Sequence, residues 1–83
     1  MHKDDIKRLI EAGLPGAQAM VYGDDGAHFD AVVICEAFAG KMTLAQHRMV
    51  YATLGDRMHS EIHALSMKTF TPAEWAASQA QQQ

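Results

Sequence analysis

Histidine is the residue type in this chain best suited to metal chemistry, and His63 has the most informative position. It stands in the segment Ile62-His63-Ala64, where a short helical stretch gives way to a strand. A histidine at such a junction can be held by the scaffold and remain open to a ligand or a partner. Neutral imidazole is also a common metal ligand. We therefore take His63 as the first candidate metal-ligating residue.

His59 offers an alternative use of the same region. His59 and His63 form a His-x-x-x-His pattern, which on one continuous helix would direct both rings at a shared zinc ion. Glu61 is displaced by one position from the His-Glu-x-x-His pattern of metalloproteases. Because a strand begins near His63, we expect helical spacing to fail across the pair and His59 to be solvated.

The other histidines stand in different settings. His28 directly follows an acidic turn and borders a strand, and Asp24 or Asp25 could orient its ring or raise its pKa. The sequence leaves both effects open. His47 lies inside an expected helix, where a surface or packing role is favoured. His2 lies in a terminal segment that we expect to be mobile, so it receives no role.

Patterns for catalysis are missing from the sequence. Ser60, Ser66 and Ser78 lie outside any Gly-x-Ser-x-Gly elbow. Cys35 lies in an apolar run, where a thiol behaves as a small hydrophobic side chain. The chain has no Cys-x-x-Cys pair and no glycine-rich loop for phosphate before a helix. We expect a protein that is not an enzyme.

The turn Gly23-Asp24-Asp25-Gly26 contains the Gly-x-x-Gly string with which KH domains clamp a nucleic-acid backbone. The KH loop joins two helices, whereas this one joins two expected strands. Its two central residues are acidic and would repel phosphate. We therefore interpret it as a hairpin turn.

The composition is that of one globular domain. The 83 residues leave no room for two independent cores, and 48% of them are hydrophobic. The net charge of −3 lacks the basic excess that non-specific nucleic-acid binding needs. With one cysteine there is no intramolecular disulfide. Neither a signal peptide nor an apolar run of about 20 residues is present, so we expect a cytoplasmic protein that does not enter a membrane.

Hydrophobic periodicity and turn signals predict the order αββααβα. Helices are expected at residues 4–12, at 43–54, through residue 59 and from 72 onward, and strands at 17–22, 28–37 and 64–69. Asp4 or Asp5 would cap the first helix, and Thr71-Pro72-Ala73-Glu74 forms a capping box for the last one. Residues 1–3 and 78–83 are expected to fray.

Strands one and two should form an antiparallel hairpin, and the helical crossover makes strands two and three parallel. The result is an α+β domain with a three-stranded mixed sheet covered by helices. Within it, Leu44, Tyr51, Leu54 and Met58 are expected to form the buried stripe of the long helix. Trp75 is expected to anchor the last helix on the core.

Four short motifs follow one another in the second half of the chain. They are Phe38-Ala39-Gly40-Lys41, Gln46-His47-Arg48-Met49-Val50, Ile62-His63-Ala64-Leu65-Ser66 and Thr71-Pro72-Ala73-Glu74-Trp75. Together they resemble the BolA family, and the turn at residues 23–29 resembles its bacterial IbaG-type branch. The resemblance covers residues 6–76, which is nearly the whole chain.

The resemblance implies a class II KH-like fold, in agreement with the order expected above. It also implies a partner, a monothiol glutaredoxin, which forms with such proteins a heterodimer bridged by a [2Fe–2S] cluster. There the glutaredoxin supplies a cysteine, and bound glutathione supplies a second thiolate. The BolA-like chain supplies the histidine of the third motif, here His63, and a histidine or cysteine from the loop between strands one and two, here His28.

This ligand set is chemically consistent. Imidazoles in place of thiolates remove negative charge from a cluster and raise its reduction potential. Imidazole ligation weakens as histidine protonates, so cluster retention should fall toward acidic pH. One chain has too few thiolates to hold a cluster, so we expect none in the isolated chain, which should be a monomer.

Two other functions stay open. The KH-like topology, and the association of some family members with transcription, allow a DNA-binding regulator. That function would need a local basic face, for which the candidates are Lys41, Arg48, Arg57 and Lys68. The acidic net charge argues against it. The third possibility is a lone zinc site at His59 and His63.

Overall fold

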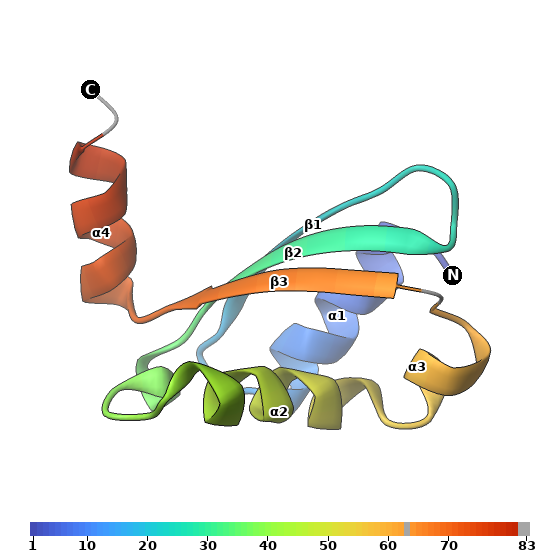
Figure 1. Ribbon diagram of the computed structural model, residues 1–83, viewed down its shortest axis with the longest axis horizontal. Helices are drawn as coiled ribbons and strands as arrows, with labels where there is room; N and C mark the ends of the chain where they lie inside the picture. The colour runs from blue at the N-terminus through green and yellow to red at the C-terminus, as the bar shows by residue number, and fades with distance from the viewer. Residues whose placement is uncertain (63, 82–83) are drawn as a thin grey trace.

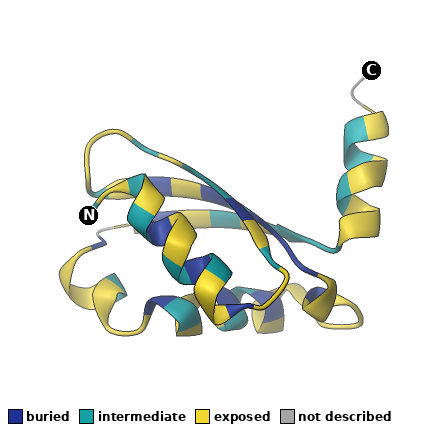
Figure 2. Ribbon diagram, turned by 180° about the vertical axis from the view of Figure 1, so that it is seen from behind, coloured by how far each residue is buried: buried dark blue, intermediate teal, exposed yellow. Residues whose placement is uncertain are grey.

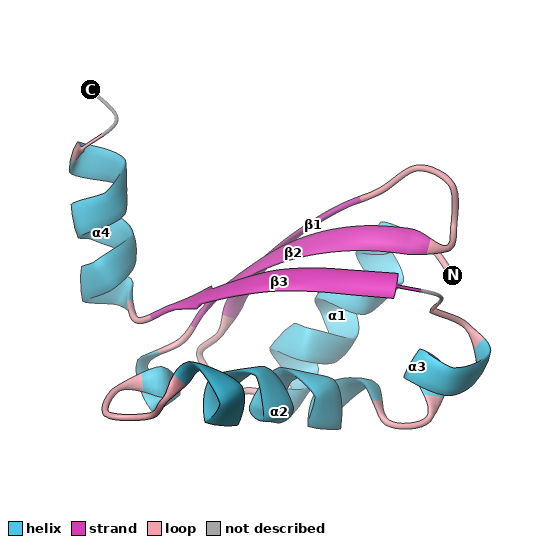
Figure 3. Ribbon diagram, in the orientation of Figure 1, coloured by secondary structure: helices cyan, strands magenta, loops and turns pink. Residues whose placement is uncertain are grey.

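The computed structural model describes residues 1–62 and 64–81. In chain order its elements are α1 (Lys3–Gly13), β1 (Gln18–Tyr22), β2 (His28–Ile34), the 3₁₀ helix η1 (Glu36–Phe38), α2 (Thr43–Leu54), α3 (Arg57–Ser60), β3 (Ala64–Phe70) and α4 (Pro72–Ala80) (Figure 1, Figure 3). The predicted αββααβα order is confirmed. The second strand is shorter than expected, because the chain turns into η1 directly after Cys35.

The sheet has the order β1-β2-β3, with β2 in the centre. β1 and β2 are antiparallel, and Tyr22 lies opposite Asp30. β2 and β3 are parallel, and His28 lies beside Ala64. Both pairings were predicted from the connections. Because β2 and β3 run the same way, their first residues lie at one end of the sheet, next to the β1–β2 loop and the N-terminus (Figure 1).

The core lies between the sheet and two helices, α1 and α2, which pack on the same face (Figures 1 and 2). Ile6, Ile10, Val33, Phe38 and Leu54 are fully buried there. Burying an aliphatic or aromatic side chain of this size contributes about 1.5–3 kcal/mol. In a domain of this size each buried side chain is a sizeable part of the core.

The buried stripe of α2 differs from the prediction. Gln46, Val50 and Leu54 face the core, whereas the Leu44 side chain is 62% exposed and Tyr51 is 38% exposed. Only Leu54 of the expected stripe is fully buried, and Met58 is partly so. At about 100° per residue, Leu44 and Tyr51 lie roughly a third of a turn away from the stripe that starts at Gln46.

A polar residue can occupy this stripe because all of its groups are paired. The Gln46 amide nitrogen donates to the carbonyl oxygens of Phe38 at 3.0 Å and Lys41 at 2.9 Å. Its carbonyl oxygen accepts from the Thr69 hydroxyl at 2.6 Å. Gln46 therefore ties the segment before α2 to β3.

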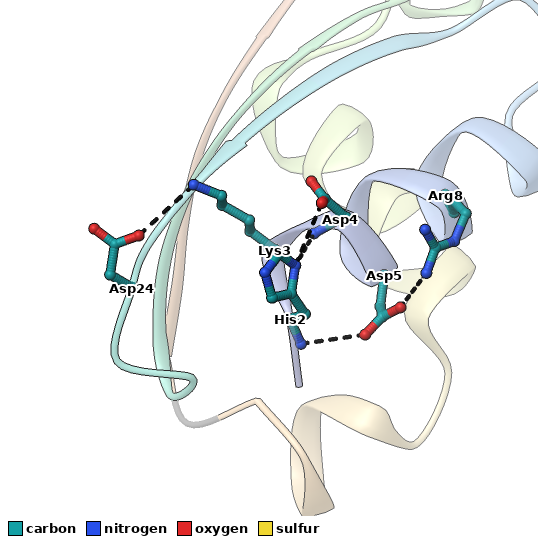
Figure 4. A network of polar contacts seen from close by, with 6 residues as sticks. All are labelled: His2, Lys3, Asp4, Asp5, Arg8 and Asp24. Atoms are coloured by element: carbon teal, nitrogen blue, oxygen red, sulfur yellow. Dashed lines mark hydrogen bonds and ion pairs between the residues drawn. The ribbon is translucent and has the colours of Figure 1, made fainter.

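α1 begins earlier than expected. His2, and not Asp4 or Asp5, is the N-cap: its Nδ1 accepts from the backbone N–H of Asp4, and the Asp5 carboxylate accepts in return from the His2 N–H (Figure 4). A ring nitrogen takes the role that a hydroxyl or carboxylate usually has. Of residues 1–3, His2 therefore caps α1 and Lys3 is its first residue.

The outer edge of β1 is covered by two side chains of α1. The Glu11 carboxylate accepts from the Ala19 N–H at 3.1 Å, and the Lys7 ammonium donates to the Ala19 carbonyl at 2.9 Å. Lys7 and Glu11 also pair with each other at 3.0 Å. The Ala19 N–H and then the Lys7 ammonium lower the pKa of the Glu11 carboxyl from its usual 4.5.

α4 has the predicted cap, with Thr71 and Glu74 forming a reciprocal capping box and Pro72 in the first turn. The expected anchoring on the core is wrong. Trp75 is only partly buried and packs edge-on against Phe70, with ring centroids 5.2 Å apart. No described residue of α4 is buried. The helix extends from the end of β3 toward the face of the sheet that α1 and α2 leave open (Figures 1 and 2).

Candidate functional site at the hairpin loop

The loop between β1 and β2 is shaped by Gly23. Its φ of 146° lies in a region that side chains rarely allow, and an added Cβ would lie 2.4 Å from the His28 carbonyl oxygen and 2.9 Å from the Phe29 ring. The loop can therefore fold tightly against the start of β2 only with glycine here. This close approach positions the acidic tip beside His28. As expected, the Gly-x-x-Gly string is a strand-to-strand turn.

Asp25 makes three contacts with the residues that follow it. One carboxylate oxygen, Oδ1, accepts from the backbone N–H groups of Ala27 at 2.9 Å and His28 at 2.8 Å. The other oxygen, Oδ2, lies 2.7 Å from the Nδ1 atom of the His28 ring. The N–H groups of His28 and Ala27, followed by the His28 ring, hold the pKa of the Asp25 carboxyl well below its usual range.

The structure thus distinguishes the two acidic residues. Asp25 contacts the His28 ring, whereas Asp24 pairs with the Lys3 ammonium at 3.6 Å (Figure 4). The N-terminal ammonium group also lies 3.5 Å from the Gly26 carbonyl oxygen. The first residues of the chain therefore lie against this loop. The His28 side chain itself is 60% exposed.

The start of β3 lies directly beside this loop. The backbone N–H of Ala64 donates to the Ala27 carbonyl at 3.0 Å, and Ala64 pairs with His28 across the ladder. His63, the first candidate ligand, lies outside the described residues. Its chain neighbour Ile62 is buried, and its other neighbour Ala64 is exposed.

The remaining candidates behave as the sequence suggested. α3 ends at Ser60, so the helical spacing needed for a zinc site starting at His59 stops there. His59 is exposed, and it lines a shallow depression together with Ala27 and residues 58–62. His47 is half-buried in α2. Cys35 is buried, with its sulfur 3.9 Å from the Pro15 carbonyl oxygen.

Metal ligands do not gather into a complete site within the part of the chain that is described. Across residues 1–62 and 64–81, no three histidine, cysteine, aspartate or glutamate side chains are grouped to hold a metal ion. The described residues therefore offer single donors, among them His28, whose ring lies against the Asp25 carboxylate.

The candidate basic residues do not all lie on one face. Lys68 lines a hollow on the open side of the sheet together with Asp30 and Tyr22. Arg48 is exposed on α2, and α2 packs on the other side of the sheet (Figure 1). Arg57 lies 3.9 Å from Glu61. None of the helices in the described ranges has both the length and the apolar character that crossing a membrane requires.

Comparison with known proteins identifies the family. A family model described as BolA-like protein matches residues 11–74. The chain belongs to the BolA family. This confirms the resemblance inferred from the four motifs and the KH-like topology expected with it.

Individual BolA relatives extend the match over nearly the whole chain. The acid stress protein IbaG of Escherichia coli is 34% identical over 92% of this chain and 90% of its own length. A solved structure of a BolA homologue from Coxiella burnetii is 48% identical, with a TM-score of 0.84, and the match covers 92% of this chain and 97% of that one. The similarity to the IbaG branch is thereby confirmed.

Two other relatives are named as transcriptional regulators. The DNA-binding transcriptional regulator BolA of Escherichia coli is 38% identical over 64% of this chain. The match covers 50% of that protein, and it covers 46% of the BolA regulator of Vibrio cholerae. The chain thus spans about half the length of these two relatives. Relatives of this chain are named as regulators and as stress proteins.

Proposed function

We propose that this BolA-family protein is a non-enzymatic adaptor that binds a monothiol glutaredoxin and completes the ligand set of a bridging [2Fe–2S] cluster. His63 and His28 would be its two donors, and the glutaredoxin cysteine and glutathione would supply the thiolates. The role would be in iron–sulfur trafficking or in iron or redox sensing. The cluster supplies one-electron redox chemistry, whose potential imidazole ligands raise.

The observation that carries the proposal is the register of β2 and β3. His28 pairs with Ala64, which directly follows His63 in the sequence. His28, at one end of the sheet, is therefore the ladder neighbour of the residue that directly follows His63 in the sequence. Neighbouring strands lie about 4.8 Å apart, so the register brings His28 within one strand spacing of Ala64.

The donor chemistry of the described residues fits a shared cluster. A [2Fe–2S] cluster takes four ligands, mostly thiolates. Cys35, the single thiol, is buried in the core, whereas the His28 ring is exposed at the start of β2. This chain can offer nitrogen donors at its surface but no accessible thiolate, so a partner would have to provide the sulfur ligands.

Reconstitution with the expected partner tests the proposal. The purified chain is mixed anaerobically with a monothiol glutaredoxin, glutathione, ferrous iron and sulfide, and the complex is isolated and its visible absorption and circular dichroism are recorded. We expect a heterodimer with a cluster whose spectrum changes in His63→Ala and in His28→Ala. His59→Ala is the matched control, because His59 is an exposed imidazole on the adjacent segment. If no complex forms, or if the spectra are the same in His63→Ala and in His28→Ala as in the unmodified chain, the proposal is ruled out.

A DNA-binding regulator is the second candidate, and the name of the Escherichia coli BolA relative is the observation that favours it. The net charge of −3 and the separated positions of Lys68 and Arg48 argue against it. Titration with duplex DNA at several salt concentrations distinguishes the two functions. Sequence-specific binding with a steep salt dependence would favour the regulator.

A further inference from the structure

The three contacts of Asp25 determine where the proton of the His28 ring lies. The Oδ1 atom of Asp25 accepts from two backbone N–H groups, and the oxygens of a carboxylate only accept hydrogen bonds. Its Oδ2 atom lies 2.7 Å from the Nδ1 atom of His28. A hydrogen bond of this length needs a proton between the two atoms. That proton must belong to the ring nitrogen.

We infer that Asp25 is a positioning residue that holds His28 as the Nδ1–H tautomer and thereby directs its metal-binding lone pair to Nε2. This inference rests on the proposed role of His28 as a ligand. Metal-binding histidines commonly donate their other ring nitrogen to a carboxylate, which sets the tautomer and fixes the ring plane. Here the carboxylate comes from the same loop, three residues before the ring that it orients.

The Asp25 carboxylate is itself held in place from the backbone. Its Oδ1 atom accepts from two consecutive N–H groups, those of Ala27 and His28, and this arrangement fixes the side chain relative to the start of β2. Asp24 pairs with the Lys3 ammonium at 3.6 Å (Figure 4). Only one of the two acidic residues is therefore arranged to orient His28.

Replacing one atom tests the tautomer. Asp25→Asn keeps an oxygen that can accept from the Ala27 and His28 amides, so the loop geometry is retained. It replaces the second oxygen with an NH₂ group, which donates and therefore needs the lone pair on Nδ1. The tautomer should reverse, with the proton on Nε2. Asp24→Asn is the matched control, since that side chain does not contact the ring.

The measurement is made on the chain without any partner. Long-range ¹H–¹⁵N correlation spectra, recorded at increasing pH until the His28 ring signals stop changing, report which ring nitrogen carries the proton. We expect Nδ1–H for His28 in the unmodified chain and in Asp24→Asn, and Nε2–H in Asp25→Asn. An Nε2–H ring in the unmodified chain, or a tautomer that Asp25→Asn leaves unchanged, would overturn the inference.

Cluster binding provides a second readout. In the reconstituted complex, Asp25→Asn should weaken cluster retention by on the order of 10-fold, because substitution of such carboxylates commonly costs 10- to 100-fold in metal affinity. Asp24→Asn should retain the cluster. If the tautomer reverses as expected but His28→Ala leaves the cluster unchanged, the ligand role of His28 fails while the control of the tautomer by Asp25 stands. The two failures are thus distinguishable.

Discussion

Gly23 lies where β1 passes into the hairpin loop, and its backbone brings the loop into contact with the start of β2. The space that a side chain would need is taken by the His28 carbonyl and the Phe29 ring. The position of the Asp25–His28 pair therefore depends on a residue that has no functional group. At this scale the candidate site is a property of backbone conformation as much as of ligand chemistry.

Gly23→Ala should disturb the loop more than the fold. The strained φ and the close contact with the His28 carbonyl should cost about 1–3 kcal/mol in the free energy of unfolding, and the loop should open to relieve them. Urea unfolding gives the stability, and amide chemical shifts show which residues move. Gly16→Ala is the control, because Gly16 also has a positive φ but has open space around it. Unmoved Ala27 and His28 amides would contradict this account.

Gln46 is a second residue whose contacts can be tested. Gln46→Leu leaves the Phe38 and Lys41 carbonyls and the Thr69 hydroxyl without their partner. Because unpaired buried polar groups cost about 1–3 kcal/mol each when water cannot replace the partner, we expect a loss of about 2–3 kcal/mol in chemical denaturation. The double variant with Thr69→Val should lose less than the sum of the single losses. Additive losses would show that the Gln46–Thr69 contact contributes little.

At the scale of elements, α1 both covers the sheet and closes the β1 edge. Ile6 and Ile10 face the core, while Lys7 and Glu11 reach the backbone of Ala19. Gly13 allows the close approach of α1 to α2, since an added Cβ would lie 2.7 Å from the Thr53 side chain. One helix therefore fixes the positions of β1 and α2 together.

The Glu11 contacts make part of the stability depend on pH. The folded pKa of Glu11 lies below its usual 4.5, so the stabilisation is present above that value and is lost as pH falls through the folded pKa. Glu11→Gln should lower the free energy of unfolding at pH 7 by about 0.5–1 kcal/mol, a modest value because solvent screens the pair. The difference from the unmodified chain should shrink below about pH 4.5. Urea unfolding between pH 3 and 7 measures this difference in the free energy of unfolding, and Glu36→Gln is the control. If the difference for Glu11→Gln does not depend on pH, the Glu11 contacts are not the cause.

Elements with local signals were predictable, and elements set by tertiary packing were less so. The end of α2 and the capping box of α4 follow from Gly55 and the Thr71–Glu74 pair, which act within one turn. The buried face of α2 was misassigned, because hydrophobicity selects Leu44 over Gln46. Only the carbonyls of the preceding segment and Thr69 explain why an amide is buried.

The candidate site, too, was predictable from local sequence signals only in part. The sequence placed His28 at the start of a strand and left open which acidic residue acts on it, and how. The choice of Asp25 follows from the loop conformation that Gly23 permits and from the pairing of Asp24 with Lys3. Neither can be read from composition or spacing. The ligand role of His63 stays a prediction.

At the scale of the whole molecule, the domain is unevenly stabilised. α1, α2 and the sheet share the buried core, whereas no described residue of α4 is buried (Figure 2). Trp75 of α4 packs edge-on against Phe70 at the end of β3. We expect α4 to open independently of the core.

Two substitutions compare these parts. Trp75→Ala should lower the free energy of unfolding by less than about 1.5 kcal/mol, whereas Phe38→Ala, which removes a fully buried ring, should cost about 3–5 kcal/mol. Hydrogen exchange should show α4 amides exchanging faster than those of α1 and α2, and faster still in Trp75→Ala. Protection of α4 equal to that of the core would contradict this view.

The parallel pairing of β2 with β3 has a consequence for assembly. His28 and Ala64 become neighbours only after the intervening helices have folded and β3 has paired with β2. In a nascent or denatured chain the two strands are apart, so a binding surface formed by both of them does not exist. A ligand that contacts both strands therefore binds only the folded domain. By mass action it would raise the melting temperature in proportion to the logarithm of its concentration.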